Sequence, residues 1–422
     1  MSRQRLRLFS TLFLTFGMVS QTCCQIALAD SGTAPVSTTG YVDKTNRFGL
    51  SLFQSVASGR QNNTFVSPLS VAMALQMVYE GADGTTRQEM AKVLNLSGLT
   101  ILQLNQACSK LDKILSAKNQ NITLSIADAL WSNQNVTFKK NYLAPIQQYF
   151  SASLHSANFT DPATMGSINS WCSQATQGKI TQIINSLDAN AIMVLLNAVY
   201  FKGLWTTPFQ SANTKPSDFH LDSKNKISVP TMYIDDSSND FSYGKGTNFE
   251  VVRLPYGPNQ KMSMYVALPA QGVALSTFIK TLNYDTLNTT ITNSYYPNEI
   301  ILKLPKFKIA FDTDLGKVLS KMGMASAFDQ GQANFSNMVD LGQGKNAYLS
   351  SVIHETYIDV DESGTVAAAV TAVEMLGSSA MPGGPPPPPI VVNVDHPFVF
   401  LIKDEGTGAI VFVGSVANPK GQ

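Results

Sequence analysis

Residues 362–380 have the sequence ESGTVAAAVTAVEMLGSSA, which carries no charge between Glu362 and Glu374 and no proline before Pro382. Such a run can form a β-strand, in which alternate side chains point to opposite faces. A strand with small, uncharged side chains on one face can enter a sheet without burying an unpaired charge, which would cost several kcal/mol. The first face would carry Thr365, Ala367, Ala369, Thr371, Val373 and Met375, and the second Val366, Ala368, Val370, Ala372, Glu374 and Leu376.

Gly364 precedes the small residues and can serve as a hinge, because glycine accepts backbone angles that are closed to other residues. A helix is the alternative, since alanine is the best helix former, and an irregular loop is another. From these residues alone, a helix or a loop is favoured over an inserted strand.

The composition bounds the class of protein. The chain has 422 residues, of which 44% are hydrophobic and 14% charged, and its formal net charge is +1. It can bury a large core, and its charge balance gives no indication of nucleic-acid binding. Because no internal linker rich in Pro, Gly and Ser divides the chain, we expect one large domain over residues 30–422.

Residues 1–29 have the features of an export signal. Arg3, Arg5 and Arg7 precede an apolar stretch, and an Ala-Leu-Ala site ends at Ala29. The apolar stretch has about 12 residues, fewer than the roughly 20 that span a bilayer, so we expect no membrane anchor. Cys23 and its neighbour leave a lipoprotein possible, but the residues before them fit a lipidation site poorly. The sequence predicts a secreted protein, with periplasm and cell surface as open alternatives.

Without the signal, Cys108 and Cys172 are the only cysteines, so no disulfide framework is expected. One bridge is possible, but two isolated buried thiols are the favoured interpretation. The chain has four histidines and, in its mature part, no H-E-x-x-H, G-x-S-x-G or C-x-x-C motif. We therefore expect no enzyme, no metal site and no cofactor.

Helical patterns occupy the first half of the chain. Phe48, Leu52 and Val56 mark an amphipathic helix. A second helix is predicted with Ser67 as its cap, Pro68 at its first position and Gly81 just past its end, and residues 85–89 offer capping boxes for a third. Strand-like segments rich in Val, Ile, Tyr and Phe follow, which predicts an α+β fold. They are residues 192–201, 262–268, 299–309, 391–402 and 409–413.

Residues 362–380 closely resemble the hinge and reactive loop of the serpins, in which an acidic residue and Gly-Thr precede a run of small residues. Residues 395–402 are similar to the strand that follows this loop, and residues 197–205 are the most specific match outside it. Shorter matches follow the family's order over nearly the whole mature chain. They are residues 63–70, 176–180, 208–209, 219–220, 229–230, 254–256, 304–307, 322–324, 327–328, 351–354, 412–414 and 418–419.

The resemblance implies the serpin fold, with helices packed on a large central mixed sheet, smaller sheets, and an exposed reactive centre loop at about residues 362–390. It implies a monomeric inhibitor that forms a covalent acyl complex with a serine or cysteine protease and then inserts its cleaved loop into the sheet. Counted by the family's spacing, the scissile bond joins Ser378 and Ser379, with Leu376, Gly377 and Met381 as alternative specificity residues. The implied hinge residues are Glu362, Gly364, Thr365, Ala367, Ala368 and Ala369.

No Arg or Lys occurs in residues 363–381, which favours elastase-, subtilisin- or chymotrypsin-like targets over trypsin-like ones. Two features depart from the family. Val366 stands where inhibitory members usually carry Glu, and residues 382–389, a Gly/Pro stretch, lengthen the loop beyond the cut. A non-inhibitory serpin that acts as a carrier, chaperone or storage protein is the main alternative.

The resemblance also implies a polar network where the sheet opens. Asn197 and His354 interrupt apolar runs, and each could simply be a satisfied buried polar group. In serpins the matching positions form a hydrogen-bond network that can be remade once a strand enters, and Trp205 marks the top of the sheet, where insertion begins. The implied sheet-opening residues are Ser67, Ser70, Asn197, Trp205 and His354.

Overall fold

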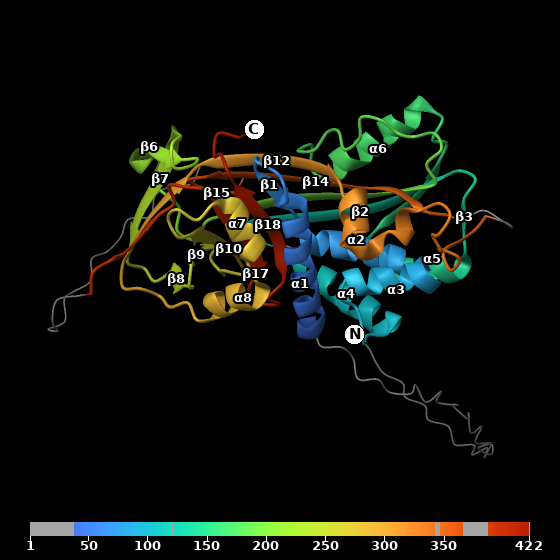
Figure 1. The fold of residues 1–422 in the computed structure, drawn as a ribbon, viewed down its shortest axis with the longest axis horizontal. Helices are drawn as coiled ribbons and strands as arrows, with labels where there is room; N and C mark the ends of the chain where they lie inside the picture. Colours follow the sequence, from blue (N-terminus) through green and yellow to red (C-terminus); the bar gives the residue numbers. More distant parts are fainter. Residues whose placement is uncertain (1–37, 118, 120, 342–346, 366–386, 422) are drawn as a thin grey trace, which may run out of the picture. The chain divides into compact units, whose positions relative to one another are not determined.

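A six-stranded mixed sheet, built from segments far apart in the sequence, runs through the middle of the computed structural model (Figure 1). The structure describes residues 38–117, 119, 121–341, 347–365 and 387–421. This central sheet has the order β12-β14-β15-β5-β2-β4, and β14 also pairs with β5 directly. Its strands are β2 (Ile122–Asn133), β4 (Ser153–Ala157), β5 (Met193–Leu204), β12 (Phe307–Asp314), β14 (Leu349–Asp361) and β15 (Gly364–Thr365).

In the part of the chain that the structure describes, three further sheets accompany the central one. A second six-stranded sheet has the order β1-β18-β17-β10-β9-β8, a four-stranded sheet has the order β16-β11-β7-β6, and β13 pairs with β3. Their strands are β1 (Thr64–Val66), β3 (Thr137–Phe138), β6 (Lys215–His220), β7 (Lys226–Asp236), β8 (Ser242–Lys245), β9 (Phe249–Tyr256), β10 (Met262–Pro269), β11 (Ile300–Pro305), β13 (Val339–Asp340), β16 (Ile390–Asn393), β17 (Phe398–Asp404) and β18 (Ile410–Val416).

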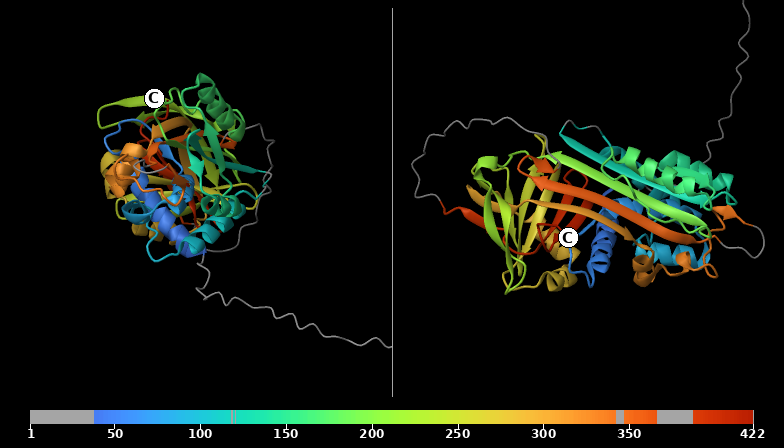
Figure 2. Two further views of the ribbon diagram at one scale, coloured as in Figure 1. Left: turned by 90° about the vertical axis from the view of Figure 1, so that its right-hand side faces the viewer. Right: turned by 90° about the horizontal axis from the view of Figure 1, so that it is seen from above.

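Helices lie on both faces of the central sheet (Figures 1 and 2). On one face, α2 packs beneath β5 and β2, and on the other, α6 packs on β2. Because both faces are covered, β5 is buried at nearly every position. The helices are α1 (Thr38–Ala57), α2 (Pro68–Gly81), α3 (Gly84–Val93), α4 (Ile101–Leu115), α5 (Lys140–Tyr149), α6 (Pro162–Ala175), α7 (Leu275–Thr281), α8 (Tyr284–Thr292) and α9 (Gly316–Leu319), with short turns at η1 (Ser211–Asn213), η2 (Ser320–Met324) and η3 (Ser326–Phe328).

The predicted helix signals are confirmed in part. The apolar stripe of α1 is buried, and Pro68 is the first residue of α2. Ser67 does occupy the cap position, but its hydroxyl donates elsewhere and makes no cap bond, and Gly81 lies inside the helix. The capping boxes predicted at residues 85–89 are wrong, because α3 starts earlier and the threonine at 86 binds residues of a distant loop.

The predicted strands were placed correctly, but two of them are each a pair of strands. Residues 299–309 divide into β11 and β12, and residues 391–402 divide into β16 and β17. In the first case the break follows Pro305, and each half joins a different sheet. The long strand β2 in the first half was not predicted.

Several predictions lie outside the described residues. They concern the export signal at residues 1–29, the bond between Ser378 and Ser379, its alternatives Leu376, Gly377 and Met381, and the hinge residues Ala367, Ala368 and Ala369.

Candidate functional site: the opening between β5 and β14

The two long middle strands of the central sheet are paired along most of their length and separate at one end. β14 and β5 run parallel, with pairing from Leu349 opposite Met193 to Tyr357 opposite Tyr200. Beyond that point β15 lies between them, antiparallel to both: Thr365 is opposite Val360 on one side and Gly203 on the other. Gly364 and Thr365, at the start of the predicted loop, therefore form a short strand inside the sheet (β15 in Figure 1).

Gly364 allows the chain to turn into this gap. Its φ is +150°, which lies in the region that residues with side chains rarely adopt. A Cβ at this position would lie 2.1 Å from the carbonyl oxygen of Gly203, so there is also no room for a side chain. Gly364 thus has a backbone conformation that favours glycine, and its role as the hinge of a moving loop stays a prediction.

Thr365 points into the protein, as its predicted facing requires. Its side chain is fully buried, and its hydroxyl forms a 2.8 Å hydrogen bond with the hydroxyl of Tyr256. The ring of Tyr256 stacks on Trp205 at 4.5 Å between centroids and meets Phe201 edge-on at 5.1 Å. Three aromatic rings, from Phe201 on β5, Tyr256 at the end of β9 and Trp205 just after β5, thus pack around the buried Thr365 side chain.

Trp205 holds the turn that leads from β14 to β15. Its indole Nε1–H donates to the carbonyl of Asp361 at 2.9 Å, and its backbone N–H donates to the carbonyl of Ser363 at 3.0 Å. The backbone N–H of Phe209 donates to the carbonyl of Glu362 at 2.9 Å. Trp205 therefore contacts the turn at which β15 begins, and its place at the start of insertion stays a prediction.

Glu362 anchors the same turn through its side chain. Its carboxylate accepts a 2.7 Å bond from Lys306 Nζ and a 2.8 Å bond from the hydroxyl of Thr214. Burial alone would raise the pKa of Glu362, but these bonds and the lysine charge outweigh it and hold the pKa below its ordinary value. The side chain of Glu362 is thus tied to Lys306, just before β12, and to Thr214, just before β6.

The four other sheet-opening residues meet where β14 and β5 are still paired. His354 stands opposite Asn197 in the register, and all four side chains are fully buried. The backbone N–H of Ser67 donates to His354 Nε2 at 3.0 Å, so His354 carries its proton on Nδ1, which donates to Asn197 Oδ1 at 2.6 Å. The Asn197 amide nitrogen donates to Ser70 Oγ. The predicted network therefore exists and ties α2 to both strands.

His354 is neutral in this network. Burial lowers its pKa to about 3, because a charged imidazole would lose its hydration. A neutral ring is also what the geometry requires, since Nε2 must accept. Ser67 Oγ continues the network to the second sheet by donating to the carbonyl of Val411, and near it on β14 Thr356 Oγ1 donates separately to the carbonyl of Phe65, both at 2.7 Å.

Two members of the site were not predicted. Tyr256 lies in a family match, but nothing local indicates that its hydroxyl meets Thr365. Asp128, on β2, accepts a hydrogen bond from the Asn197 amide. The sequence did indicate that Asp128 is unusual, because residues 126–131 form an apolar strand pattern that this single carboxylate interrupts.

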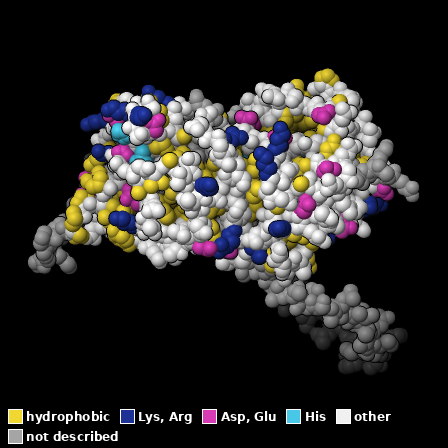
Figure 3. Space-filling model, in the orientation of Figure 1, with side chains coloured by type: hydrophobic (Ala, Val, Ile, Leu, Met, Phe, Trp, Pro, Cys, Tyr) yellow, Lys and Arg dark blue, Asp and Glu magenta, His cyan; other side chains and the backbone are white. Residues whose placement is uncertain are grey.

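Other chemistry is sparse in the part of the chain that the structure describes. Cys108 and Cys172 are free and buried, as the favoured interpretation predicted. Within the described ranges, three or more potential metal ligands do not gather anywhere, and no helix is long and apolar enough to cross a membrane. On the face shown in Figure 3, basic and acidic side chains are interspersed.

Comparison with known proteins gives one family throughout. The family model described as Serpin (serine protease inhibitor) matches residues 43–419. Human Serpin B11 is 32% identical over 394 residues, which cover 88% of this chain and 97% of the relative. The thermophilic serpin Tengpin in its native state has a TM-score of 0.82 at 30% identity, with 92% and 96% of the two chains covered. Human thyroxine-binding globulin has a TM-score of 0.80 at 26% identity, with 91% and 100% covered.

Proposed function

Because the chain belongs to the serpin family, we propose that it is an exported inhibitor that traps serine or cysteine proteases by inserting its cleaved loop between β14 and β5. Family membership assigns protease inhibition in general and no enzymatic activity. The observation that carries the finer proposal is β15, where Gly364 and Thr365 already pair with both flanking strands.

The proposed reaction starts as ordinary proteolysis. A protease nucleophile attacks the carbonyl carbon of Ser378, the amine of Ser379 leaves, and the protease is held as an acyl ester or thioester. The released end of the loop then extends β15 down the sheet and carries the bound protease with it. Distortion of the protease active site leaves the acyl bond standing, since loss of one oxyanion donor alone slows such enzymes roughly a hundredfold to a thousandfold.

The free energy available for this step is large. A new strand of about a dozen residues gains hydrogen bonds on both edges at roughly 1 kcal/mol each, so insertion could yield on the order of 10 kcal/mol. Insertion must also precede deacylation, which at typical turnover takes roughly milliseconds to a second. A leading residue that is already seated, such as Thr365, shortens the path that the loop must travel.

The loop sequence supports a target class. Small or apolar residues around the proposed bond suit elastase-, subtilisin- or chymotrypsin-like proteases, and the absence of Arg and Lys in residues 363–381 disfavours trypsin-like ones. Export and a monomeric state are part of the proposal. The signal-like residues 1–29 support the former, and they predict a mature chain that begins at Asp30.

A carrier function is the second candidate, because thyroxine-binding globulin is a structural neighbour. The two candidates differ in the hinge. A carrier does not require insertion, whereas the small residues that follow Thr365 in the sequence suit an inserting strand.

The test is incubation of the mature protein with purified elastase-, subtilisin-, chymotrypsin- and papain-like proteases. We expect an SDS-resistant complex with at least one of them. Mass spectrometry should show that the released C-terminal peptide begins at Ser379. The protein with its loop already cut serves as the control and should form no complex. If every protease cuts the loop and departs fully active, the inhibitor proposal is wrong.

A further inference from the structure

The Asn197 side chain is held between two strands by groups of different charge. Asp128 stands opposite Asn197 in the antiparallel pairing of β2 with β5, and its carboxylate accepts a hydrogen bond from the Asn197 amide nitrogen. On the other side, the Asn197 oxygen accepts from His354 on β14. One amide therefore connects a carboxylate on a strand that stays in place with an imidazole on the strand that must move away.

These contacts allow only one orientation of the amide. Ser67 fixes the His354 proton on Nδ1, so a reversed amide would place its NH₂ group against another donor. At the other end it would place its oxygen against the Asp128 carboxylate, where two acceptors repel. An ionised Asp128 thus penalises the reversed orientation independently of His354.

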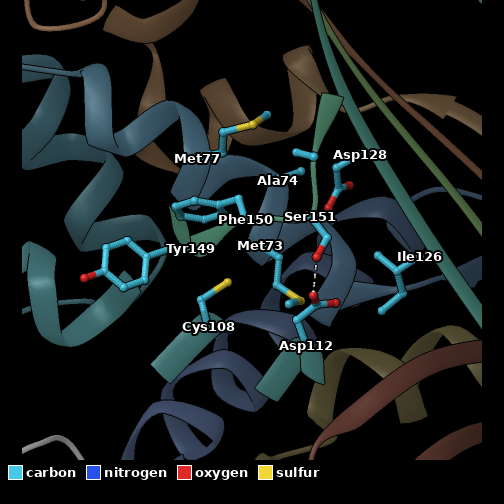
Figure 4. A pocket seen from close by; sticks show the side chains of 11 residues that line it. Met73, Ala74, Met77, Cys108, Asp112, Ile126, Asp128, Tyr149, Phe150 and Ser151 are labelled. Atoms are coloured by element: carbon cyan, nitrogen blue, oxygen red, sulfur yellow. Dashed lines mark hydrogen bonds between the residues drawn. The ribbon is translucent and has the colours of Figure 1, made fainter. Parts of the chain in front are cut away.

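Asp128 lies beside a small cavity on the α2 side of the sheet (Figure 4). The cavity has a volume of about 20 Å³, which is enough for one water molecule. Asp112 and Cys108 on α4 and Tyr149 at the end of α5 are the other titratable groups that line it, and Asp112 is hydrogen-bonded to Ser151 at 2.6 Å. None of the described residues that line the cavity is a cation, so nothing there compensates the charge of Asp128.

We propose that Asp128 is a positioning residue of the sheet-opening site, and that its negative charge tightens the closure between β5 and β14 by fixing the Asn197 amide toward His354. This inference rests on the loop insertion proposed above, because insertion is the movement that separates His354 from Asn197. Asp128 and Asn197 lie on adjacent strands that remain paired throughout, so the carboxylate acts only through the amide.

The charge of Asp128 responds to pH in the neutral range. Burial raises its pKa to about 7, the hydrogen bond from Asn197 lowers it in part, and the charge of Asp112 adds to the rise. The lowering contribution is complete only while His354 fixes the amide, so the pKa is higher in the opened sheet than in the closed one. By linkage, ionisation favours the closed sheet, and protonation as the pH falls through about 7 favours opening.

The experiment measures how fast a synthetic peptide with the sequence of residues 365–375 enters the uncleaved protein. The readout of entry is the rise in the heat stability of the protein. The experiment needs no protease. The pH dependence of peptide entry can therefore be absent from a protein that inhibits proteases, and it can be present in one that does not. We expect entry to be roughly fivefold faster at about pH 5.5 than at about pH 8.5, since a charge-assisted hydrogen bond is about twice as strong as a neutral one. Asp128→Asn keeps an acceptor without the charge, and its entry rate should be the same at both pH values.

Two carboxylates provide matched controls. Asp112→Asn changes a carboxyl group of the same cavity that does not touch Asn197, so entry should stay faster at the lower pH, with the midpoint moved to lower pH because the charge of Asp112 no longer raises the pKa of Asp128. Glu355 lies on β14, one residue from His354, and burial raises its pKa to about 7 as well. Glu355→Gln should also keep the pH dependence. Loss of the dependence in Glu355→Gln, or its persistence in Asp128→Asn, would overturn the proposal.

Hydrogen exchange gives a second measurement that needs no variant. In the wild-type protein, amide protection in β5 and β14, corrected for intrinsic exchange, should decrease as the pH falls below about 7. Protection that is constant across this range, or peptide entry that is independent of pH in the wild type, contradicts the assignment.

Discussion

The two ends of the contact between β5 and β14 are held by different chemistry. At the open end, Gly364 and Thr365 are seated on the stacked rings of Trp205 and Tyr256, and the contacts are mainly backbone pairing and apolar packing. At the closed end, Asn197 and His354 bond directly across the strands within a buried polar network. In the proposed insertion, the entering strand passes the apolar open end first and must then separate the buried network at the closed end, so the network limits how fast a strand enters fully.

The largest effect is expected from Thr365→Arg, which places a charge at a fully buried position at the open end. Burying an unpaired guanidinium costs several kcal/mol, so the cut loop should no longer insert and the protein should become a substrate. Gel electrophoresis with a susceptible protease should show cleaved inhibitor and no SDS-resistant complex.

Asn213→Arg is the matched control, because it adds the same charge at an exposed position beside the hinge anchor. It should leave complex formation intact. Wild-type inhibition in Thr365→Arg would show that this residue does not face inward during insertion.

Gly364→Ala should weaken inhibition without abolishing it. The new Cβ would lie 2.1 Å from the carbonyl oxygen of Gly203, and the backbone angle is strained for alanine, at a cost of roughly 1–3 kcal/mol. We expect the number of inhibitor molecules consumed per trapped protease to rise severalfold.

Titration of a fixed amount of protease measures this ratio. Gly166→Ala is the control, because a Cβ there meets nothing within 4 Å. Equal ratios for the two variants would argue against the seated β15.

His354→Gln tests the closed end through its pH dependence. The folded protein holds this histidine neutral with a pKa of about 3, whereas the unfolded chain binds the proton near pH 6.5. The free energy of unfolding contributed by neutral His354 is therefore present above about pH 6.5 and is lost as the pH falls toward 3.

We expect the variant to be about 1–3 kcal/mol less stable than the wild type at neutral pH, with a difference that narrows in acid. Urea unfolding at several pH values gives both quantities. His220→Gln, at an exposed position on β6, should follow the wild-type curve, and a parallel shift of His354→Gln at all pH values would contradict the assigned neutral state.

The smallest effect is expected from Tyr256→Phe, which removes only the 2.8 Å bond to Thr365 and keeps the stacked ring. The lost hydrogen bond is worth about 1 kcal/mol, which corresponds to roughly a fivefold change in the population of molecules in which β15 is paired with its neighbours. Hydrogen exchange at β15 measures it. Tyr295→Phe, on an exposed side chain, should change nothing there, and equal protection in both variants would mean that the bond does not hold the hinge.

The sequence predicted the fold class, and it predicted contacts among several residues of the site, because both depend on local signals and on family motifs. The roles of these residues in loop insertion stay predictions. The hinge glycine, the inward facing of Thr365 and the meeting of Asn197 with His354 follow from spacing and resemblance. The prediction that the Ser67 side chain caps α2 was wrong, because its hydroxyl donates to the carbonyl of Val411, which lies far away in the sequence. Asp128 and Tyr256 could not be placed, since their partners lie on strands 69 and 109 residues away.

The most direct measurement is the melting temperature of the protein before and after a single cut in the loop, recorded at one scan rate. If the cut loop occupies the space between β5 and β14, the added hydrogen bonds should raise the melting temperature by at least roughly 10 °C. Identical melting of the intact and the cut protein would contradict insertion as the source of inhibition.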